Sequence, residues 1–381
     1  MSDAEPTSRI DDAIGGRSVL VFERGMLRPR RRKPVHGVEL FRIRLLGELA
    51  ALGVQVTLVC ERSWAPKVRE LGGEGIRVLT SPYLVRAAPT GAVLVHRAKV
   101  AARRRGRPFD VLVLGDPSVR QAWHAAHLID AGVAHRTLIM AHGRGRTPAL
   151  DRLTGRPFDV HAVSHHVAEE FRGRFEGNLT VGYGIAGAGA FESVAPACDR
   201  PRLADEKLRC VLLARLPSVS KGEDTAREAW RVLPESVRAR AELHLVGYLD
   251  PPAPDQQNLI TSRWVPNDRV PELLASMHVM LVPSTNESFC QSMAQAMLVG
   301  LPVVCSPLPV LAEKVDTGGG RVCETPAALA GAIAELERDD EHRMAMGRIA
   351  RQTAHERYVW DTGRFAREVV FPEHKVRRDE S

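Results

Sequence analysis

Hydrophobic positions along the first half of the chain fall into short apolar runs separated by longer amphipathic stretches. Apolar runs that predict β-strands lie at 18–22, 54–60, 76–80, 109–115, 136–143 and 158–164. A helix is expected at 38–52, between the first two strands. Nearly continuous apolar runs are typical of strands that helices cover on both faces, so this half predicts a parallel α/β sheet.

The periodicity fails between 184 and 207, where Gly, Ala and Pro are frequent, and this stretch predicts an interdomain linker. The alternation then resumes, with a mostly helical region after 325. The second series of strands is predicted at 208–215, 241–247, 258–264, 278–284 and 302–306, with helices at 222–233, 268–277 and 290–299.

Two series of this kind predict an α/β protein with two Rossmann-like, doubly wound parallel-sheet domains that face a central cleft. We expect an N-terminal domain at 1–195, which would bind the acceptor, and a C-terminal domain at 196–357, which would bind the donor. A final helix at 358–381 is expected to cross back to the first domain. The length of 381 residues also favours two domains of about 150–200 residues each.

Composition indicates the class of protein and the cellular environment in which it is expected. Hydrophobic residues make up 44% and charged residues 26%, which is an ordinary globular balance. No apolar run reaches the roughly 18–20 residues that span a bilayer, and the first residues resemble neither a signal peptide nor an anchor. Peripheral contact with a membrane is left open. Six scattered cysteines without a C-x-x-C pair favour a reduced, cytoplasmic setting in which they fill the core.

The net charge of +7 suits an anionic partner, although a GC-rich genome, which favours Arg and Ala, would give the same balance. Basic residues gather at 28–33 and 103–107, and the first cluster is either an anion-binding loop or a solvated one. Aromatic residues are only 5% of the chain and no nucleic-acid-binding motif is present, so we expect no nucleic-acid partner.

Two cations follow the first strand of the second series. Arg215 ends the predicted strand, and Lys221 precedes the next helix. Cations six residues apart beside a helix N-terminus suit a diphosphate, although two ordinary surface charges would have the same spacing. Neither a P-loop nor a dinucleotide fingerprint is present.

A second candidate site follows the strand at 278–284. The run of backbone N–H groups from Ser284 to Cys290 would form an anion site at the N-terminus of the next helix. The residues expected to bind the donor there are Ser288, Phe289, Cys290 and Gln291. Glu287 would repel a phosphate but suits sugar hydroxyls, and Gln295 could hold a further pair of hydroxyls. The alternatives are a helix-dipole partner for Glu287 and an exposed position for Gln295.

These stretches resemble the donor domain of GT-B glycosyltransferases of retaining family 4 (glycosyl transferases group 1). The resemblance rests on "RLPSVSKG" and on "VPSTNESFCQSMAQAMLVGLPVV", which resembles the family's P-S, E-S-F-G and A-x-G-x-P-V-V pattern. In the first half it rests on "HGVELFRIRLLGELAALGVQV", "MAHG" and "VHAVS". It covers about 18–361.

The resemblance implies a role for each matching residue. Arg215 and Lys221 would hold the donor diphosphate, Glu287 the donor sugar and Gln295 the ribose. Three further groups are implied: Gly37 close to the phosphates, His142 near the transferred sugar, and Trp264 with Val265 in the base pocket. In this chain Gln295 replaces the usual acid, His36 replaces a glycine, and "TVGYG" replaces the usual N-G after the sixth strand.

Other candidates carry less. Asp116 follows a strand and is a candidate acceptor contact or a helix N-cap, and Arg144 is a second candidate acceptor contact. The cluster at His161, His165 and His166 lacks a matching acid or Cys spacing for zinc. No D-x-D follows a strand, so we expect no metal and no other cofactor.

Together these features predict a retaining, metal-independent glycosyltransferase. It would move a sugar from a nucleotide-sugar donor to the O, N or S atom of a small-molecule acceptor, in the biosynthesis of a thiol, a glycan or a specialised metabolite. A nucleotide-sugar epimerase of the same fold, and a nucleotide-sugar-binding protein without transferase activity, are the alternatives. A homodimer is left open.

Overall fold

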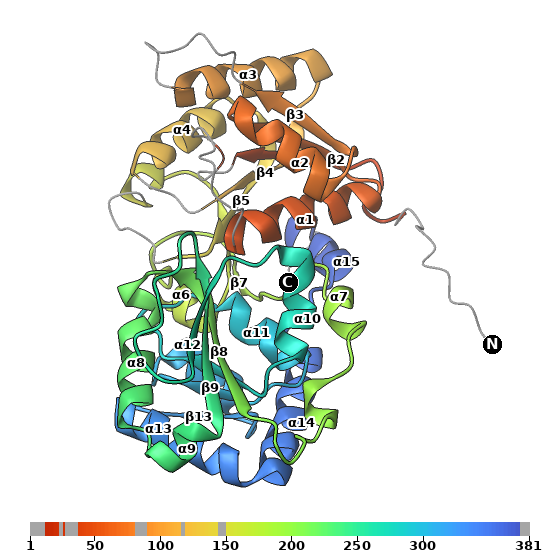
Figure 1. The fold of residues 1–381 in the computed structure, drawn as a ribbon. Helices are drawn as coiled ribbons and strands as arrows, with labels where there is room; N and C mark the ends of the chain where they lie inside the picture. The colour runs from red at the N-terminus through yellow and green to blue at the C-terminus, as the bar shows by residue number, and fades with distance from the viewer. Residues whose placement is uncertain are drawn as a thin grey trace, which may run out of the picture. The chain divides into compact units, whose positions relative to one another are not determined.

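The computed structural model of the protein describes residues 12–22, 26, 37–80, 90–115, 119–143 and 150–373. The chain divides into two compact units, which we call unit 1 (Met1–Gly182 with Asp361–Ser381) and unit 2 (Tyr183–Trp360). Figure 1 shows the elements of each unit. The sequence had placed the division at 195 and 196, whereas the compact units divide after Gly182.

Unit 1 contains a sheet of seven parallel strands in the order β3-β2-β1-β4-β5-β6-β7. The strands are β1 (Ser18–Phe22), β2 (Gln55–Cys60), β3 (Ile76–Thr80), β4 (Phe109–Leu114), β5 (Ala134–Ala141), β6 (Asp159–Ala162) and β7 (Leu179–Val181). The six strands predicted from apolar runs are confirmed to within two residues at each end. β7 was not predicted, because a three-residue edge strand shows no period.

Helices connect these strands as expected for parallel pairs. They are α1 (Gly37–Ala51), α2 (Ala65–Gly72), α3 (Thr90–Arg105), α4 (Val119–Asp130) and α6 (His165–Glu169), followed by α15 (Thr362–Phe365) and the π-helix Ala366–Val370 at the end of the chain. The last two elements are attached to unit 1 by side chains. Thr362 donates a hydrogen bond to Glu48, and Arg136 donates to the carbonyl oxygens of Val369 and Val370 at 2.6 and 2.8 Å.

Unit 2 contains a sheet of six parallel strands in the order β10-β9-β8-β11-β12-β13. The strands are β8 (Leu208–Leu216), β9 (Ala241–Tyr248), β10 (Leu259–Arg263), β11 (Val279–Val282), β12 (Val303–Cys305) and β13 (Gly320–Val322). Five of them were predicted, and β13, another three-residue edge strand, was not. All six cysteines of the chain are unpaired and buried, as their scattered positions predicted.

The helices of unit 2 cover both faces of its sheet (Figure 1). They are α7 (Gly189–Glu192), α8 (Glu223–Val232), α9 (Glu235–Ala239), α10 (Val270–Ala275), α11 (Gln291–Leu298), α12 (Pro309–Val315), α13 (Pro326–Arg338) and α14 (Asp340–Arg357). The chain runs outward from β8 to β10 and then returns to β11 on the other side of β8. Because such crossovers are right-handed, the connecting helices α8 and α11 lie on opposite faces. α13, which follows β13, returns to pack against α8.

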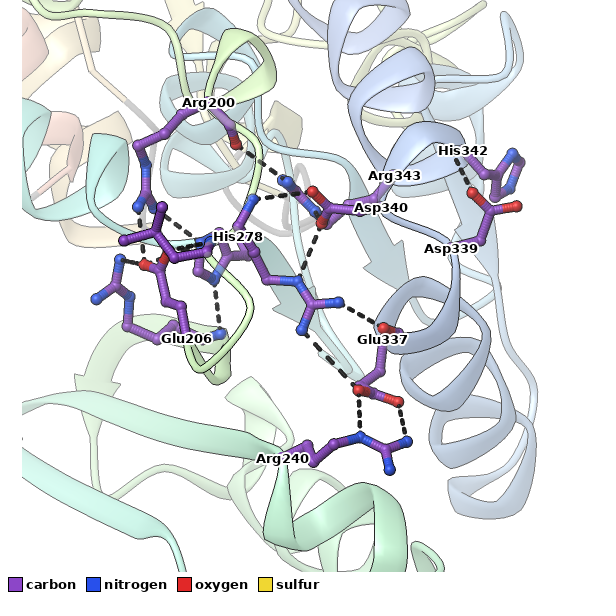
Figure 2. A network of polar contacts seen from close by, with 12 residues as sticks. Arg200, Glu206, Arg240, His278, Glu337, Asp339, Asp340, His342 and Arg343 are labelled. Atoms are coloured by element: carbon purple, nitrogen blue, oxygen red, sulfur yellow. Dashed lines mark hydrogen bonds and ion pairs between the residues drawn. The ribbon is translucent and has the colours of Figure 1, made fainter.

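The stretch predicted as a linker is part of the packed body of unit 2. Figure 2 shows how a network of charged side chains binds it. Arg202 donates to Asp340 from its backbone N–H at 2.9 Å and from Nε at 3.0 Å. Arg200 donates to Glu206 at 2.8 Å and lies 2.8 Å from the ring of His278. This region therefore begins unit 2 rather than lying loosely between two bodies.

Candidate donor site

The sheet of unit 2 reverses its strand order between β8 and β11, and ligands of open parallel sheets bind beyond the carboxyl ends of the strands at such a point. The loops that follow these two strands are joined directly, because the N–H of Thr285 donates to the carbonyl oxygen of Ser220 at 3.0 Å. Ser220 and Thr285, which are 65 positions apart in the sequence, are thus neighbours.

Gly222 allows the first of these loops to approach the second so closely. It has φ of +70° and precedes α8, and a Cβ at this position would lie 1.9 Å from the carbonyl oxygen of Pro283. Any other residue would both strain the backbone and clash with the end of β11. Lys221, the preceding residue, is held at this tight crossing.

Two of the three charged residues predicted to bind the donor, Lys221 and Glu287, form an ion pair. Lys221 Nζ donates to Glu287 Oε1 at 2.7 Å, and Ser284 Oγ donates to the same oxygen at 2.9 Å. The Glu287 side chain is 8% exposed and the Lys221 side chain is 29% exposed. Because an ammonium has three N–H donors, Lys221 can bind a phosphate while it keeps Glu287. The structure brings these two predicted residues together.

The loop after Glu287 leads into α11 through a strained residue. Cys290 is the N-cap of α11 and has φ of 65° and ψ of 78°, a left-handed conformation that costs a non-glycine residue about 1–2 kcal/mol. The sequence offered the signal, since Cys290 stands where the E-S-F-G pattern has glycine. Burial, with help from the Glu287 carboxylate, raises the pKa of the Cys290 thiol to about 12, so the thiol stays protonated.

The backbone at the start of α11 can receive an anion. Within the described ranges, the N–H groups of residues 288–291 donate to no acceptor. Phe289 and Cys290 are buried, while Ser288 and Gln291 are partly buried. Unsatisfied N–H groups at a helix N-terminus are the usual ligands of phosphates and carboxylates.

The remaining predicted donor residues of unit 2 lie on three different elements. Arg215, near the end of β8, is exposed and makes no ion pair with any described residue. Gln295 is partly buried in the second turn of α11. Trp264 and Val265 follow β10 and are partly buried, and the N–H of Trp264 donates to the Tyr248 carbonyl at 2.8 Å.

Lys314 was not identified as a candidate from the sequence, yet its side chain packs against Phe289, in the loop that precedes α11. Its side chain is fully buried, and Nζ is 4.1 Å from the ring centroid of Phe289 and 4.6 Å from that of Tyr358. Burial lowers the pKa of Lys314 to about 8, against the opposing effect of Glu313. A signal existed: Lys314 follows Val310 and Leu311 by four and three positions, so it lies on their apolar helix face.

In unit 1 the predicted sugar contact, His142, is buried directly after β5. Its Nε2 accepts a hydrogen bond from Arg42 Nε at 3.1 Å, which leaves the ring proton on Nδ1. Burial, together with the nearby Arg42 and His161, lowers the pKa of His142 well below its usual value. His142 is therefore a neutral hydrogen-bond donor through Nδ1. Arg42 was missed, because a lone arginine in an amphipathic helix gives no sign of its partner.

Other predictions for unit 1 have mixed outcomes. Gly37 is the first residue of α1 and has φ of 38°, which favours glycine. Asp116, Arg144 and the basic loop at 28–33 lie outside the described residues. His161 is bonded through both ring nitrogens, to Thr180 Oγ1 at 2.9 Å and to the Gly182 carbonyl at 2.6 Å.

Neither a metal cluster nor a membrane span is found in the part of the chain that the structure describes. No three His, Cys, Asp or Glu side chains gather there in a way that could hold a metal ion. None of the described helices combines the length and apolarity that crossing a bilayer requires.

Comparisons with known proteins agree with this fold. Residues 199–353, which lie within unit 2, match the family "Glycosyl transferases group 1". Anabaena HepE in complex with UDP and glucose superposes with a TM-score of 0.68 at 18% identity, over 93% of this chain and 98% of that one. The prediction of two doubly wound domains of the GT-B type is confirmed.

Two curated relatives match over shorter stretches. D-inositol 3-phosphate glycosyltransferase of Corynebacterium urealyticum is 36% identical over 100 residues, which is 24% of this chain and 23% of that protein. 2-Deoxystreptamine glucosyltransferase of Streptomyces kanamyceticus is 35% identical over 75 residues, 20% of this chain and 18% of that protein. The match thus spans about a fifth of the length of each relative.

Proposed function

We propose that the protein is a glycosyltransferase that moves a sugar from a nucleotide-sugar donor to a small-molecule acceptor. The observation that carries the proposal is the Lys221–Glu287 ion pair at the strand-order reversal of a glycosyl transferases group 1 domain. A cation for the leaving diphosphate and a carboxylate for sugar hydroxyls then lie side by side. The names of both curated relatives, which are glycosyltransferases, support the same reaction.

The donor would be held by groups of unit 2. Lys221 and Arg215 would stabilise the charge that develops on the departing diphosphate, usually a large part of catalysis. The N–H groups at the start of α11 would add to this stabilisation. Glu287 would accept from sugar hydroxyls, and Gln295 would bind the ribose in place of a carboxylate. Trp264 and Val265 would contact the base.

We further propose a retaining reaction without a protein nucleophile. The acceptor would attack from the side of the leaving group, and the donor phosphate would take its proton. The protonated Cys290 thiol is unsuited to attack the sugar. His142 would orient the sugar through Nδ1–H, and Gly37 would let the backbone approach the phosphates. Because Lys221 and Arg215 already supply cations, the proposal needs no metal.

The acceptor is proposed by analogy only. The relatives are named for D-inositol 3-phosphate and 2-deoxystreptamine, so polyhydroxylated rings of this kind are the first acceptors to try. An O, N or S nucleophile would serve the same mechanism. Unpaired cysteines throughout the chain fit a cytoplasmic location, which is part of this proposal.

The proposal is tested by a donor screen. The melting temperature of the protein is measured with UDP-, GDP-, ADP- and TDP-sugars, because a ligand that binds the native state raises it. We expect one base to stabilise the protein most. If no nucleotide-sugar stabilises it, the proposal is wrong. If the sugar is isomerised without any acceptor, the protein is an epimerase.

A further inference from the structure

The short helix α12 carries a lysine on the face that it buries. Val310, Leu311, Lys314 and Val315 are the buried residues of this helix, and Lys314 is 0% exposed. Three apolar side chains are normal on such a face, whereas a buried ammonium is expensive unless it is paired.

The surroundings of the Lys314 ammonium are aromatic rather than acidic. Phe289, from the loop before α11, and Tyr358, which follows α14, lie at 4.1 and 4.6 Å from Nζ, within the range of cation–π contacts. Tyr183 packs edge-on against Phe289 with ring centroids 4.3 Å apart. Nζ has no hydrogen-bond partner among the described residues, and its ion-pair partner Glu313 is 3.8 Å away.

Such an arrangement is poor for stability. Replacing a buried charge by an apolar side chain of similar volume is often neutral or stabilising. A methionine at this position would keep the length of the side chain and remove the cost of burying the charge. The positive charge of Lys314 is therefore better explained by its effect on neighbouring residues than by a contribution to the stability of the fold.

The neighbours of Lys314 belong to the proposed donor site. Phe289 lies two residues after Glu287 and directly before the left-handed Cys290, so the position of its ring constrains the whole loop. Glu287 and Cys290 are close enough to Lys314 to act on its pKa electrostatically. Glu287 is thus paired with the partly exposed Lys221 and interacts electrostatically with the buried Lys314.

We propose that Lys314 is a positioning residue for the donor diphosphate: its ammonium fixes Phe289 and the loop from Glu287 to Cys290, and its charge offsets the repulsion between Glu287 and the bound phosphates. The inference rests on the proposed function. When Lys221 shares its charge between Glu287 and a bound phosphate, Lys314 remains a second positive charge that acts on Glu287 electrostatically. Donor affinity should then depend on the charge of Lys314.

Several ionisable groups surround Lys314, and only some of them are expected to change in the same pH range. Glu313 lies on its own helix, Glu287 and Cys290 on the donor loop, and Arg357 with Tyr358 at the end of α14. Burial raises the pKa values of the Cys290 thiol and the Tyr358 hydroxyl to about 12, so both stay neutral at pH 9. Lys314, with a pKa of about 8, loses its proton between pH 7 and 9.

The test compares the wild-type protein with Lys314→Met, Lys314→Arg and Lys67→Met. Lys67 pairs with Glu70 on α2 of unit 1, so its variant has the same net charge as Lys314→Met without touching the donor site. Dissociation constants for UDP, ADP and GDP are measured calorimetrically at pH 7 and pH 9, and melting temperatures are recorded without ligand.

We expect Lys314→Met to bind the preferred diphosphate about tenfold more weakly at pH 7 while melting at a higher temperature. Wild-type affinity should fall several-fold from pH 7 to pH 9. The affinity of Lys314→Met should change only by the amount that ionisation of the diphosphate itself causes. Lys314→Arg, charged at both values, should keep its affinity. Lys67→Met should behave as wild type.

The remaining outcomes separate the two hypotheses. If the wild type binds none of the three diphosphates, the proposed function is wrong and this inference fails with it. If the wild type binds and Lys314→Met binds equally well, only the role of Lys314 is overturned. A variant that loses stability and affinity together also overturns it. Should Lys314→Met not fold, an unchanged wild-type affinity between pH 7 and pH 9 decides against the inference.

Discussion

Unit 2 buries two cations completely, and their surroundings are opposite. Arg343, on α14, is 0% exposed, donates from Nε to Asp340 at 2.8 Å and from Nη2 to the carbonyl of Arg200 at 3.2 Å (Figure 2). Lys314 is equally buried, but it meets two aromatic rings and no hydrogen-bond acceptor among the described residues.

The two buried cations differ in their effect on stability. Arg343 stabilises the fold through its hydrogen bonds, whereas Lys314 is buried at a cost to stability. Hydrogen bonds from Arg343 and Arg202 hold the pKa of Asp340 well below its usual range, so these groups are ionised together and join residues 200–202 to α14. An arginine suits this role because its planar group bonds several acceptors at once. Lys314 forms no comparable hydrogen-bond network among the described residues. What it affects most directly is the position of the donor loop.

Arg343→Met should have the largest effect, a loss of about 3–5 kcal/mol of unfolding free energy, because it removes the hydrogen bonds that the guanidinium donates to Asp340 and to the Arg200 carbonyl, each worth about 1.5–3 kcal/mol for a charged donor. Urea unfolding measures this loss. Arg231→Met, which breaks an exposed pair with Glu228, is the control and should leave the midpoint of urea unfolding nearly unchanged, because exposed ion pairs contribute little to stability. Diphosphate affinity of folded Arg343→Met should equal that of wild type. A loss of affinity with unchanged stability would reverse the assignment.

Lys314→Met should have the opposite effect and raise the free energy of unfolding at pH 7 by up to about 3 kcal/mol. This amount corresponds to the lowering of the Lys314 pKa from 10.5 to about 8. The unfolded chain binds this proton more tightly than the folded site does. Wild-type stability should therefore rise between pH 8 and pH 10.5, whereas the variant should lack that rise. Urea unfolding across this range checks both. If the free energy of unfolding of wild type and of Lys314→Met changes with pH in the same way, the cost assigned to burying Lys314 is wrong.

Gln295→Glu should have the smallest effect, within about tenfold on donor affinity, which corresponds to about 1.4 kcal/mol. If position 295 faces the ribose, a carboxylate accepts from both hydroxyls, so affinity for the diphosphate improves while affinity for the free base, which lacks the ribose, stays unchanged. Calorimetric titration with the preferred diphosphate and with its free base measures the change. An identical affinity for every ligand would indicate that Gln295 faces solvent.

The sequence predicted the central strands well and the edges poorly. β1 and β3 begin and end at the predicted residues, because continuous apolar runs bounded by polar turns leave few choices. β7 and β13 have three residues each, too few to establish a period. The adjacency of Lys221 and Glu287 followed from their places after two strands that a doubly wound sheet makes neighbours.

The supporting residues of the site could not be predicted in the same way. Lys314, Phe289 and Tyr358 come from three elements, and their contact depends on how helices pack, not on local pattern. Arg42 reaches His142 across 100 residues for the same reason. Sequence reasoning located the groups that would touch a donor and missed the groups that hold them.

The most direct test of the central claim is a stoichiometric transfer assay with the donor that stabilises the protein most. Wild type should release one nucleoside diphosphate for each glycosylated acceptor formed. Lys221→Ala should be slower by about 10²–10³-fold at saturating donor, because it removes a cation from the leaving group. Lys207→Ala, which alters a lysine at the opposite end of β8, is the control. Near-normal turnover by Lys221→Ala, or sugar conversion without acceptor, would contradict the claim.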